Sequence, residues 1–520
     1  MAEPHSPQWT VGIDIGGSFT DIVAARRSDG ETLTAKVPTK PGDRVASLLA
    51  ALAAVGLEWD DVSDLIHGTT MVTNAIVEGR LAKVALIATK GFKDTLAIGR
   101  QNRRHLYRLD LPPKLAPLVA SERSFEVDER LDHDGGVLRP LADADIDAAV
   151  DRAMASGAEA VAVSLLHAYA NPQHEERIGE RVRKRLSYVA LSNRVNPEAR
   201  EYERTATTVL SASVMPLAAG YLDELCARKP SRSRLHLFHS AGDMASPESL
   251  RESPLGLAMS GPAAGAMAAA QLARQLALDH AISFDMGGTT TDVCLITSGR
   301  PEVATDRSLN DRPLRQPMVA VESIGAGGGS IAHIDHGALC VGPESAGADP
   351  GPACYARGGA RATVSDANLL LGYLNRNRLF GNELRLDEEA ARAAIGKLAG
   401  EAGMGLVETA LGIVAVANQT MVRALRRITV ERGIDGRQCT LVAFGGAGPM
   451  HAVAVARAFG IARVIVPAAS SVFSALGCVG AEMGYSQQQT LRMPNTAWDL
   501  SRLNGVREEL RARLAAPLLA

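Results

Sequence analysis

Short apolar runs alternate with helical patterns along the chain. Val11 to Ile15 and Asp21 to Ala25 are apolar runs on either side of a Gly pair, which predicts two strands around a tight turn. Apolar residues recur with helical spacing from Val45 to Val55. Val84 to Thr89 and Val161 to Leu166 are continuous apolar runs, typical of buried strands. Strands that alternate with helices in this way predict an α/β fold.

The rest of the chain continues this alternation. A second strand, turn and strand unit is predicted at Ala281 to Ile296. The stretch from Gly325 to Tyr355 is crowded with Gly and Pro, which favours an ordered loop region facing a ligand. Ala199 to Ala227 has the pattern of a long helix, interrupted at Pro216. Further helices are predicted at Glu175 to Leu186, Glu388 to Leu398 and Val407 to Gly433, and short strands at Leu441 to Phe444 and Val464 to Pro467.

An internal repeat is the most informative feature of the sequence. Asp14-Ile-Gly-Gly-Ser-Phe-Thr-Asp21 recurs as Asp285-Met-Gly-Gly-Thr-Thr-Thr-Asp292, with five of the eight positions identical. Both copies stand between apolar strands. A single Gly-rich turn is a weak signal, whereas two copies with the same acidic, Gly and hydroxyl spacing indicate a shared role.

The residue types in both copies suit the phosphates of a nucleotide. Paired glycines let the backbone approach a phosphate and leave N–H groups free to donate to it. The leading aspartates, Asp14 and Asp285, end strands, where a carboxylate can hold Mg²⁺ or one of its waters. Two opposed hairpins would grip the phosphates of ATP from two sides, and the metal would neutralise the charge that develops in transfer. The predicted contacts are Gly16, Gly17, Ser18, Thr20 and Asp21, and Gly287, Gly288, Thr289, Thr290, Thr291 and Asp292.

A simpler interpretation is that each copy is an ordinary β-hairpin whose Asp caps its own turn. Two matched copies favour the nucleotide interpretation. Other motifs are absent: the Gly396-Lys397 pair is followed by Leu398, so the chain has no GxxxxGK[ST] loop. HExxH and GxSxG are also absent, which argues against zinc proteases and serine hydrolases.

Composition narrows the class of protein without changing the predicted fold. The 520 residues carry a net charge of −3 and 4% aromatic residues, which argues against nucleic acid as a partner. The first ten residues lack a basic segment followed by an apolar stretch, and the longest apolar run, Leu48 to Leu57, is half a membrane span. A cytoplasmic protein without membrane contact is therefore expected. Six cysteines without a CxxC pair predict neither disulfides nor a zinc site.

The two hairpins, together with Phe444-Gly-Gly-Ala-Gly-Pro-Met-His451, resemble the sugar kinase, seventy-kilodalton heat-shock chaperone and actin superfamily. In that superfamily two ribonuclease-H-like domains clamp ATP, and the hairpins correspond to its two phosphate loops. The turn of Gly445, Gly446, Ala447 and Gly448 resembles its adenosine loop. Within the superfamily, the chain is most similar to A-type subunits of the hydantoinase and 5-oxoprolinase family, which includes acetone carboxylase β-type subunits. The residues that carry this resemblance are His67-Gly-Thr-Thr70, Thr73-Asn-Ala75, Arg200-Glu-Tyr-Glu-Arg-Thr205, Ser260-Gly-Pro-Ala-Ala-Gly265, Gly325 to Ala332, Gly342 to Tyr355, Asp366-Ala-Asn368 and Ser470 to Gly477.

The resemblance implies an α/β fold of two ribonuclease-H-like domains that form an ATP-binding cleft, with inserted loops. It places an N-terminal domain over residues 8–190, an ATP-binding domain over 200–490, and a tail over 491–520 where family members carry a further domain. It implies ATP and Mg²⁺ as cofactors, and a B-type subunit as partner in an oligomer.

The resemblance also implies a reaction. In the leading hypothesis ATP phosphorylates the carbonyl oxygen of a cyclic amide, such as a hydantoin or 5-oxoproline, and water completes the hydrolysis. The second hypothesis is the ATP-handling subunit of a ketone carboxylase, which shares these motifs. The third is an ATP-driven conformational switch that binds a partner protein.

Other candidate residues have a functional and a structural interpretation. His67 ends an apolar stretch, where it is predicted to polarise a carbonyl or move a proton, the alternative being a His that bonds local backbone. His451 is expected to pack at a helix start. Glu201 and Arg204, at i and i+3, predict a solvated or interdomain ion pair. Substrate or metal contact and structural roles both stay open for Asp349, Asp366, His239 and Asp243, and Cys354 has no assigned role.

Overall fold

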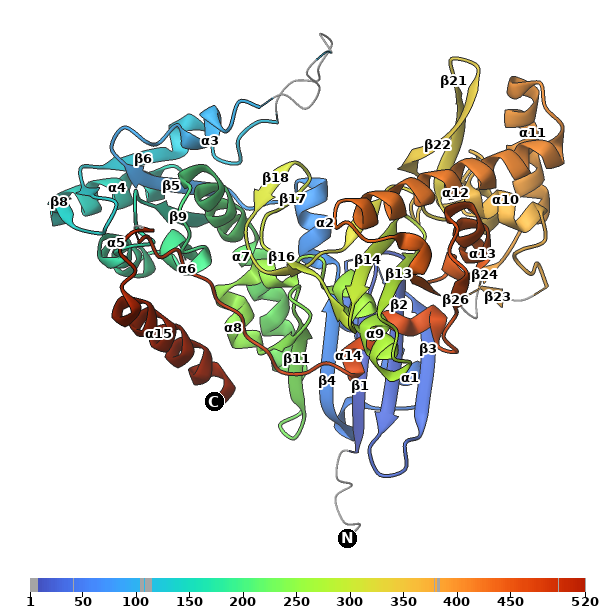
Figure 1. The fold of residues 1–520 in the computed structure, drawn as a ribbon, viewed down its shortest axis with the longest axis horizontal. Coiled ribbons are helices and arrows are strands. Elements are labelled where there is room, and N and C mark those ends of the chain that lie inside the picture. The colour runs from blue at the N-terminus through green and yellow to red at the C-terminus, as the bar shows by residue number, and fades with distance from the viewer. Residues whose placement is uncertain are drawn as a thin grey trace.

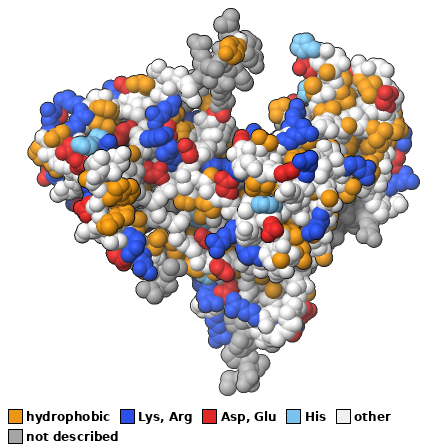
Figure 2. Space-filling model, viewed as in Figure 1, with side chains coloured by type: hydrophobic (Ala, Val, Ile, Leu, Met, Phe, Trp, Pro, Cys, Tyr) orange, Lys and Arg blue, Asp and Glu red, His pale blue; other side chains and the backbone are white. Residues whose placement is uncertain are grey.

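The structure is a computed structural model that describes residues 8–40, 42–102, 107, 115–377, 379–380, 384–493 and 495–519. Most of the N-terminal stretch used above to argue against a leader lies outside these residues. Basic and acidic side chains are interspersed over the face shown in Figure 2, with no single basic patch, and this face is hollowed between two lobes.

The first sheet has six strands in the order β12-β11-β4-β1-β2-β3. Its centre is the predicted hairpin: β1 pairs antiparallel with β2, and on its other side β1 pairs parallel with β4. Helices α1, α2 and the second half of α7 bury their apolar faces on one side of this sheet. The bounds are β1 (Trp9–Ile15), β2 (Phe19–Arg26), β3 (Thr32–Pro38), β4 (Val62–Thr69), β11 (Arg234–Phe238), β12 (Met244–Ala245), α1 (Arg44–Ala54), α2 (Met71–Glu78) and α7 (Glu201–Arg228).

The second sheet repeats the first in topology. Its main path runs β15-β14-β13-β25-β26, with the antiparallel and parallel pairings of β3-β2-β1-β4-β11. Helices α12 and α13 cover one face of this sheet, while α9 and α14 pack on the other. The bounds are β13 (His280–Met286), β14 (Thr291–Thr297), β15 (Arg300–Pro301), β25 (Thr440–Phe444), β26 (Arg463–Ile465), α9 (Ser260–Gln275), α12 (Leu406–Val430), α13 (Gly448–Phe459) and α14 (Phe473–Val479).

Helices α9 and α14 are shared between the two sheets. Helix α14 packs on β1, β2 and β4 of the first sheet and on α9, and α9 also packs on β13 of the second. In Figure 1 both helices are seen at the centre, where the strands of the two sheets overlap. This arrangement turns the same ends of β1 and β13 toward a common cleft, so the two repeated turns face each other. The predicted α/β fold with two similar halves is confirmed.

A separate four-stranded sheet is inserted after the fourth strand of the first half. Its order is β10-β9-β5-β6 and all its strands are parallel. Helices α4 and α5 cover one face, and the first half of α7 covers the other. It forms the left-hand lobe of Figure 1. The bounds are β5 (Val84–Thr89), β6 (Ser124–Val127), β9 (Ala160–Ser164), β10 (Val189–Leu191), α4 (Asp143–Ala155) and α5 (Gln173–Arg183).

The sequence division between residues 190 and 200 stays a prediction. In space, the first sheet takes strands from both sides of this division, because β11 and β12 pair beside β4. Remaining elements are α3 (Thr95–Ile98), α6 (Ser192–Val195), α8 (Pro247–Glu252), α10 (Val364–Leu370), α11 (Glu388–Ala402), α15 (Leu500–Leu519), β7 (Arg130–Leu131), β8 (Val137–Arg139), β16 (Val303–Ala304), β17 (Arg307–Leu309), β18 (Arg312–Leu314), β19 (Met318–Val319), β20 (Glu322–Ile324), β23 (Leu379–Phe380) and β24 (Leu384–Arg385).

Two predicted elements differ from the structure. Helix α7 runs through Pro216 without a break, because its two halves are buried against different sheets and this packing outweighs the bond that a proline removes. Its length and composition would fit a membrane span, but 78% of its apolar window is buried inside the protein; α11 and α12 fit only if joined as one bent span. The Gly-rich stretch contains a hairpin of β21 (Ser330–Asp335) and β22 (Ala338–Ser345), where loops are predicted.

Candidate functional site

The two repeated turns have the same backbone geometry. In the first, the Gly16 N–H donates to the Phe19 carbonyl at 3.0 Å, and in the second the Gly287 N–H donates to the Thr290 carbonyl at 3.0 Å. A Cβ on Gly17 or Gly288 would meet nothing within 4 Å, so both turn tips are open. The structure therefore presents two equivalent tips with accessible backbone, as the repeat predicts.

An open pocket, with about 660 Å³ of empty space that includes space open to solvent, joins both turns to several other segments. Ser18 and Phe19 from the first turn and Gly287 and Gly288 from the second line it together. Two residues of a glycine strip (Gly327 to Gly329), the turn after β25 and several apolar side chains also line it. These further residues are Lys36, Gly328, Gly329, Gly347, Pro352, Tyr355, Ser365, Leu374, Gly446, Ala447 and Met450.

The turn after β25 docks against the second hairpin. Ala447 N–H donates to the Met286 carbonyl at 2.9 Å, and Gly445 N–H donates to the Ser470 carbonyl at 2.9 Å. Gly446 and Ala447 face the pocket, beside the apolar side chain of Met450. Gly448 begins α13 and lies against the backbone of β13, where a Cβ would be 3.3 Å from the Phe284 carbonyl. This combination of open backbone and apolar surface suits a planar base and its sugar.

The glycine strip is a part of the pocket that the sequence placed in a ligand-facing region without assigning it to the nucleotide. Gly328 N–H donates to the Gly287 carbonyl at 3.0 Å, and Gly329 N–H to the Gly288 carbonyl at 2.6 Å. A Cβ on Gly327 would lie 2.6 Å from the backbone of Thr289. Close packing of this kind requires glycine, so the strip buttresses the second turn.

Four carboxyl groups lie where the two hairpins meet. Asp14 is opposite Asp21 in the first hairpin register, and Asp285 is opposite Asp292 in the second. Burial, then the charge of Asp21, raises the pKa of Asp14 to about 7. Burial, then the charges of Asp292 and Asp14, raises the pKa of Asp285 to about 8. The carboxyl groups of the two hairpins therefore interact electrostatically.

This carboxyl cluster suits a divalent cation. Asp14 Oδ1 and Asp292 Oδ1 are buried and have no hydrogen-bond partner among the described residues. Within the described part of the chain, no group of three or more His, Cys, Asp or Glu side chains is arranged to hold a metal alone. Mg²⁺ usually takes one or two carboxylates together with water and phosphate oxygens, so Asp14 and Asp285 fit a metal that arrives with phosphates.

Backbone crowds both leading aspartates. A Cβ on Gly68 would lie 3.1 Å from Asp14 Oδ1, and a Cβ on Gly261 would lie 2.9 Å from it. On the other side, a Cβ on Gly445 would lie 2.2 Å from Asp285 Oδ1. These glycines leave the carboxylates no room to turn away, which fixes their direction.

Lys36 is a site residue that the sequence analysis missed. It lies opposite Asp21 in the β2–β3 register, and its Nζ donates to Asp21 Oδ1 at 2.5 Å and to the Ser471 carbonyl at 3.2 Å. Its charge lowers the pKa of Asp14 and Asp285, against the effect of burial. The strand pairing that brings Lys36 to the pocket was the only available signal, and it requires the register of a third strand.

Two predicted nucleotide contacts are corrected by the structure. Thr20 is fully buried and shares a hydrogen bond of 3.0 Å with the Thr39 hydroxyl. Thr291 is also fully buried, and its hydroxyl donates to the Ala326 carbonyl. Both side chains lie on the buried side of their strand, because successive strand residues face opposite sides of a sheet. They anchor the hairpins, whereas Ser18, Thr289 and Thr290 are at least partly exposed.

Comparison with known proteins identifies the family of the chain. A family model described as hydantoinase/oxoprolinase N-terminal region matches residues 10–186, and one described as hydantoinase/oxoprolinase matches residues 204–487. The chain belongs to the hydantoinase/oxoprolinase family.

Members of the hydantoinase/oxoprolinase family with known names cover most of this chain. The caprolactamase subunit alpha of Pseudomonas jessenii is 37% identical over 97% of this chain and 75% of its own length. The crystal structure of the ATP-dependent caprolactamase from that organism has a TM-score of 0.85, with 36% identity, over 98% of this chain and 76% of the other. A nucleotide-free acetone carboxylase structure has a TM-score of 0.82, with 28% identity, over the same shares.

His67 of this hydantoinase/oxoprolinase chain lies away from the open pocket. Its side chain is fully buried, and its Nε2 lies 2.5 Å from the Tyr221 hydroxyl on α7. Burial lowers the pKa of His67 to about 4. A neutral ring sealed in the core between β4 and α7 cannot exchange protons with a substrate in the pocket. The catalytic role predicted for His67 is therefore replaced by the structural alternative.

We expect His67→Phe to lower stability while leaving ATP turnover intact. The Tyr221 hydroxyl would lose its partner, which costs about 1–3 kcal/mol. Because the ring titrates near 4 when folded and near 6.5 when unfolded, the unfolded chain binds the extra proton between these values. Wild-type stability then falls as pH drops through this window, and this contribution is absent from the variant. Urea unfolding of both proteins at pH 7 and 4.5, beside kcat, tests this; a large loss of kcat at unchanged stability would contradict it.

The other candidates have structural roles in the family fold. His451 is buried at the start of α13, between Asn418 at 2.7 Å and Asn368 at 3.0 Å, as expected. Asp366 caps α10 and accepts from the Cys354 N–H at 2.7 Å. Glu201 and Arg204 form the expected ion pair, in which Arg204 is fully buried and the Glu201 side chain is partly exposed. His239 and Asp243 meet through backbone, and the His239 ring accepts from the Ala241 N–H.

Proposed function

We propose that this chain binds Mg·ATP between the two hairpins and uses it to hydrolyse a cyclic amide. One observation carries this proposal: both repeated turns, the glycine strip and the turn after β25 line one pocket, and each hairpin that carries a turn also holds a pair of carboxyl groups. The proposed nucleotide contacts are Gly16, Gly17, Ser18, Gly287, Gly288, Thr289 and Thr290, with Gly446 and Ala447 at the base and sugar.

Different residues of the chain bind the phosphates and the metal. The open tips at Gly17 and Gly288 offer backbone N–H groups from two sides. Asp14 and Asp285 would hold the metal, while Lys36 offsets part of their charge and opposes the rise that burial causes in the pKa of Asp21. Mg·ATP supplies the phosphoryl group and the charge neutralisation that its transfer needs. The rigid backbone around both aspartates keeps these groups aligned during the reaction.

The substrate class rests on chemistry and on the named relatives. An unstrained amide is a poor electrophile, and phosphorylation of its carbonyl oxygen makes the carbonyl carbon more electrophilic. Water adds to that carbon, the ring C–N bond breaks as the nitrogen takes up a proton, and hydrolysis of the resulting acyl phosphate releases phosphate. The caprolactamase of Pseudomonas jessenii, named as ATP-dependent, matches this chain at 36–37% identity over nearly all of it. A cyclic amide such as a lactam, a hydantoin or 5-oxoproline is the class we infer.

A ketone carboxylase subunit is the second candidate. The acetone carboxylase structure has a TM-score of 0.82 with this chain, close to the value for caprolactamase. The fold therefore suits either substrate class. In the hydrolase, water attacks the phosphorylated amide, whereas in the carboxylase the phosphorylated ketone reacts with a carboxyl group derived from bicarbonate. A requirement for bicarbonate separates them.

We infer a B-type partner subunit, an oligomer and a cytoplasmic location. The caprolactamase relative is named as a subunit alpha, which supports the partner. All six cysteines are free, which supports a reducing compartment.

The experiment uses the full chain with the partner that co-purifies with it. We expect a lactam, a hydantoin or 5-oxoproline to raise ATP turnover at least about tenfold, a change of about 1.4 kcal/mol in barrier, with release of the ring-opened product. Turnover that depends on bicarbonate and a ketone would replace the hydrolase by the carboxylase. If no cyclic amide and no ketone changes ATP turnover, both enzyme proposals fail and the partner-binding switch takes their place.

A further inference from the structure

The inserted sheet has the architecture of a ligand-binding sheet. All four of its strands are parallel, so their carboxyl ends meet at one edge. The chain passes from β5 to β6 on one side and then crosses to β9 on the other side of β5. In open parallel sheets, ligands bind outside the carboxyl ends of the strands where the direction of winding reverses. That point lies between the ends of β5 and β9.

A buried polar network occupies this edge. Thr89, the last residue of β5, donates to Glu129 and accepts from the Leu166 N–H at 3.0 Å. Glu129 also lies 2.7 Å from the His174 ring. Glu175 accepts from the Leu165 N–H at 2.8 Å, and from Ser192 and Asn193. The loop after β9 is thus fixed on both sides.

The first turn of α7 closes the edge with charged groups. Arg204 Nη2 donates to the Leu165 carbonyl at 2.8 Å and to Glu201, and its guanidinium lies 5.4 Å from the centre of the Tyr169 ring. Arg204 is completely buried, yet its Nε and Nη1 have no hydrogen-bond partner among the described residues. Asn193 Nδ2 in the same edge is likewise unpartnered within that part of the chain. A fold that buries unsatisfied donors here does so for positioning or binding.

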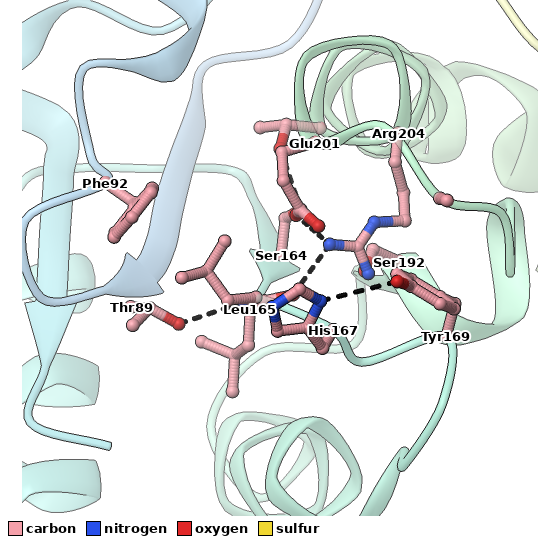
Figure 3. Close-up of polar contacts among 12 residues, drawn as sticks. Thr89, Phe92, Ser164, Leu165, His167, Tyr169, Ser192, Glu201 and Arg204 are labelled. Atoms are coloured by element: carbon pink, nitrogen blue, oxygen red, sulfur yellow. Dashed lines mark hydrogen bonds and ion pairs between the residues drawn. The ribbon is translucent and has the colours of Figure 1, made fainter. Parts of the chain in front are cut away.

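Glu201, Phe92 and His167 are among the side chains at this edge that reach solvent. The Glu201 side chain is 26% exposed, and Phe92 is 38% exposed. His167 is half-buried and adopts a left-handed backbone with φ of 58°, and Figure 3 shows one of its ring nitrogens directed toward Tyr169. Figure 3 shows Glu201, His167 and the Arg204 guanidinium converging, with Phe92 on the β5 side of the same edge.

These open groups offer one acceptor and one donor side by side. Only one oxygen of Glu201 bonds Arg204 among the described residues, which leaves the other as an acceptor. Burial lowers the pKa of His167, so the ring is neutral at pH 7. Nδ1 lies 3.4 Å from the Tyr169 hydroxyl. When that hydroxyl donates to Nδ1, Nε2 carries the ring proton and is available to donate to a ligand.

We propose that this edge is a second ligand site, which binds the amide edge of a small cyclic amide. A ring holds its amide in the cis form, so the N–H and the carbonyl oxygen lie on one edge of the molecule. Glu201 accepts from the N–H, His167 donates to the carbonyl oxygen, and the exposed ring of Phe92 packs on the apolar part. Arg204 is a positioning residue that holds the Glu201 carboxylate and the loop after β9.

The site is separate from the nucleotide pocket. None of its residues lines that pocket, and in Figure 1 the inserted sheet and the two hairpins belong to different lobes. The donor and acceptor indicate an amide, and the choice of a cyclic one rests also on the proposed function. No chemical step is assigned to this site.

Isothermal titration of ε-caprolactam into the full chain without nucleotide tests the proposal. We expect one site with a Kd in the millimolar range, and at least about a tenfold weaker Kd for Glu201→Gln and for His167→Asn. Asn tolerates the left-handed backbone at position 167, which protects the loop. N-methylacetamide, whose trans amide separates N–H from the carbonyl, is expected to bind at least about tenfold more weakly than the lactam.

Two matched variants make the result specific. Glu180→Gln makes the same change at an exposed position on α5 in the same domain and should bind as wild type. Asp60→Asn, at an exposed position outside both sites, should also bind as wild type. Wild-type affinity in both Glu201→Gln and His167→Asn, or no binding by the wild type, overturns the second site. If the lactam binds in a Glu201-dependent way but does not stimulate ATP turnover, the second site is supported and the proposed function is contradicted. If the lactam stimulates ATP turnover but its binding does not depend on Glu201, the proposed function is supported and the second site is contradicted.

Discussion

Asp14→Asn and Asp285→Asn are each expected to reduce ATP turnover about a thousandfold, with the fold intact. Both carboxylates lie where the two phosphate turns meet, and an amide of the same shape provides no charge for Mg²⁺. Glycine backbone lies against both side chains, so neither has room to be replaced by a neighbour. Steady-state ATP turnover at saturating Mg²⁺ measures the effect. Asp60→Asn, the same change at an exposed position, serves as the control.

The same variants have a predicted effect on stability. Burial and like charges raise the pKa of Asp14 to about 7 and of Asp285 to about 8, far above their value near 4 in an unfolded chain. Between these values the folded, metal-free protein binds more protons than the unfolded chain, so its stability falls as pH rises from about 4 to about 8. Asn does not ionise and removes this contribution.

Calorimetry in the absence of Mg²⁺ tests the sign of this effect. The unfolding free energy of either variant should equal or exceed that of the wild type at pH 8, and the difference should shrink toward pH 5. A variant that keeps wild-type turnover would disprove the metal role. A variant that unfolds more easily at pH 8 would show that the carboxylates stabilise the fold by contacts that the structure does not contain.

The features that the sequence predicted are those encoded by neighbours along the chain. Both hairpins, the α/β alternation and the helix at Val45 to Val55 depend on local spacing, and the structure confirms them. The repeat also predicted that two equivalent turns would share one pocket, because the same residue types recur at the same spacing. The open tips at Gly17 and Gly288 agree with that prediction.

The features that the sequence could not predict depend on which side of a strand a residue faces and on pairing between strands that are far apart in the chain. Every residue of β4 but one is buried, so periodicity gave no face for His67, whose ring turned into the core. Lys36 reaches the pocket through the register of β2 with β3. Strands β11 and β12 follow the whole inserted sheet along the chain and yet pair in the first sheet, and no local sequence pattern encodes this long-range pairing.

Gly445→Ala is expected to damage both stability and turnover. Gly445 has φ of +80°, and a Cβ there would lie 2.2 Å from Asp285 Oδ1 and 2.7 Å from the Met286 carbonyl. The left-handed backbone and the overlap together are expected to lower the unfolding free energy by about 2–4 kcal/mol. Because relief requires Asp285 or the end of β13 to move, ATP turnover should fall about a hundredfold.

Gly446→Ala is the matched control, one residue further along the same turn. A Cβ on Gly446 meets nothing within 4 Å, and its backbone is outside the left-handed region. Its unfolding free energy should stay within about 0.5 kcal/mol of the wild type. Because Gly446 lines the pocket, any effect on turnover should appear in the KM for ATP and leave kcat unchanged. Equal stability of the two variants, measured by urea unfolding, would mean that the turn after β25 does not hold Asp285 in place, and the geometry proposed for the metal would fall with it.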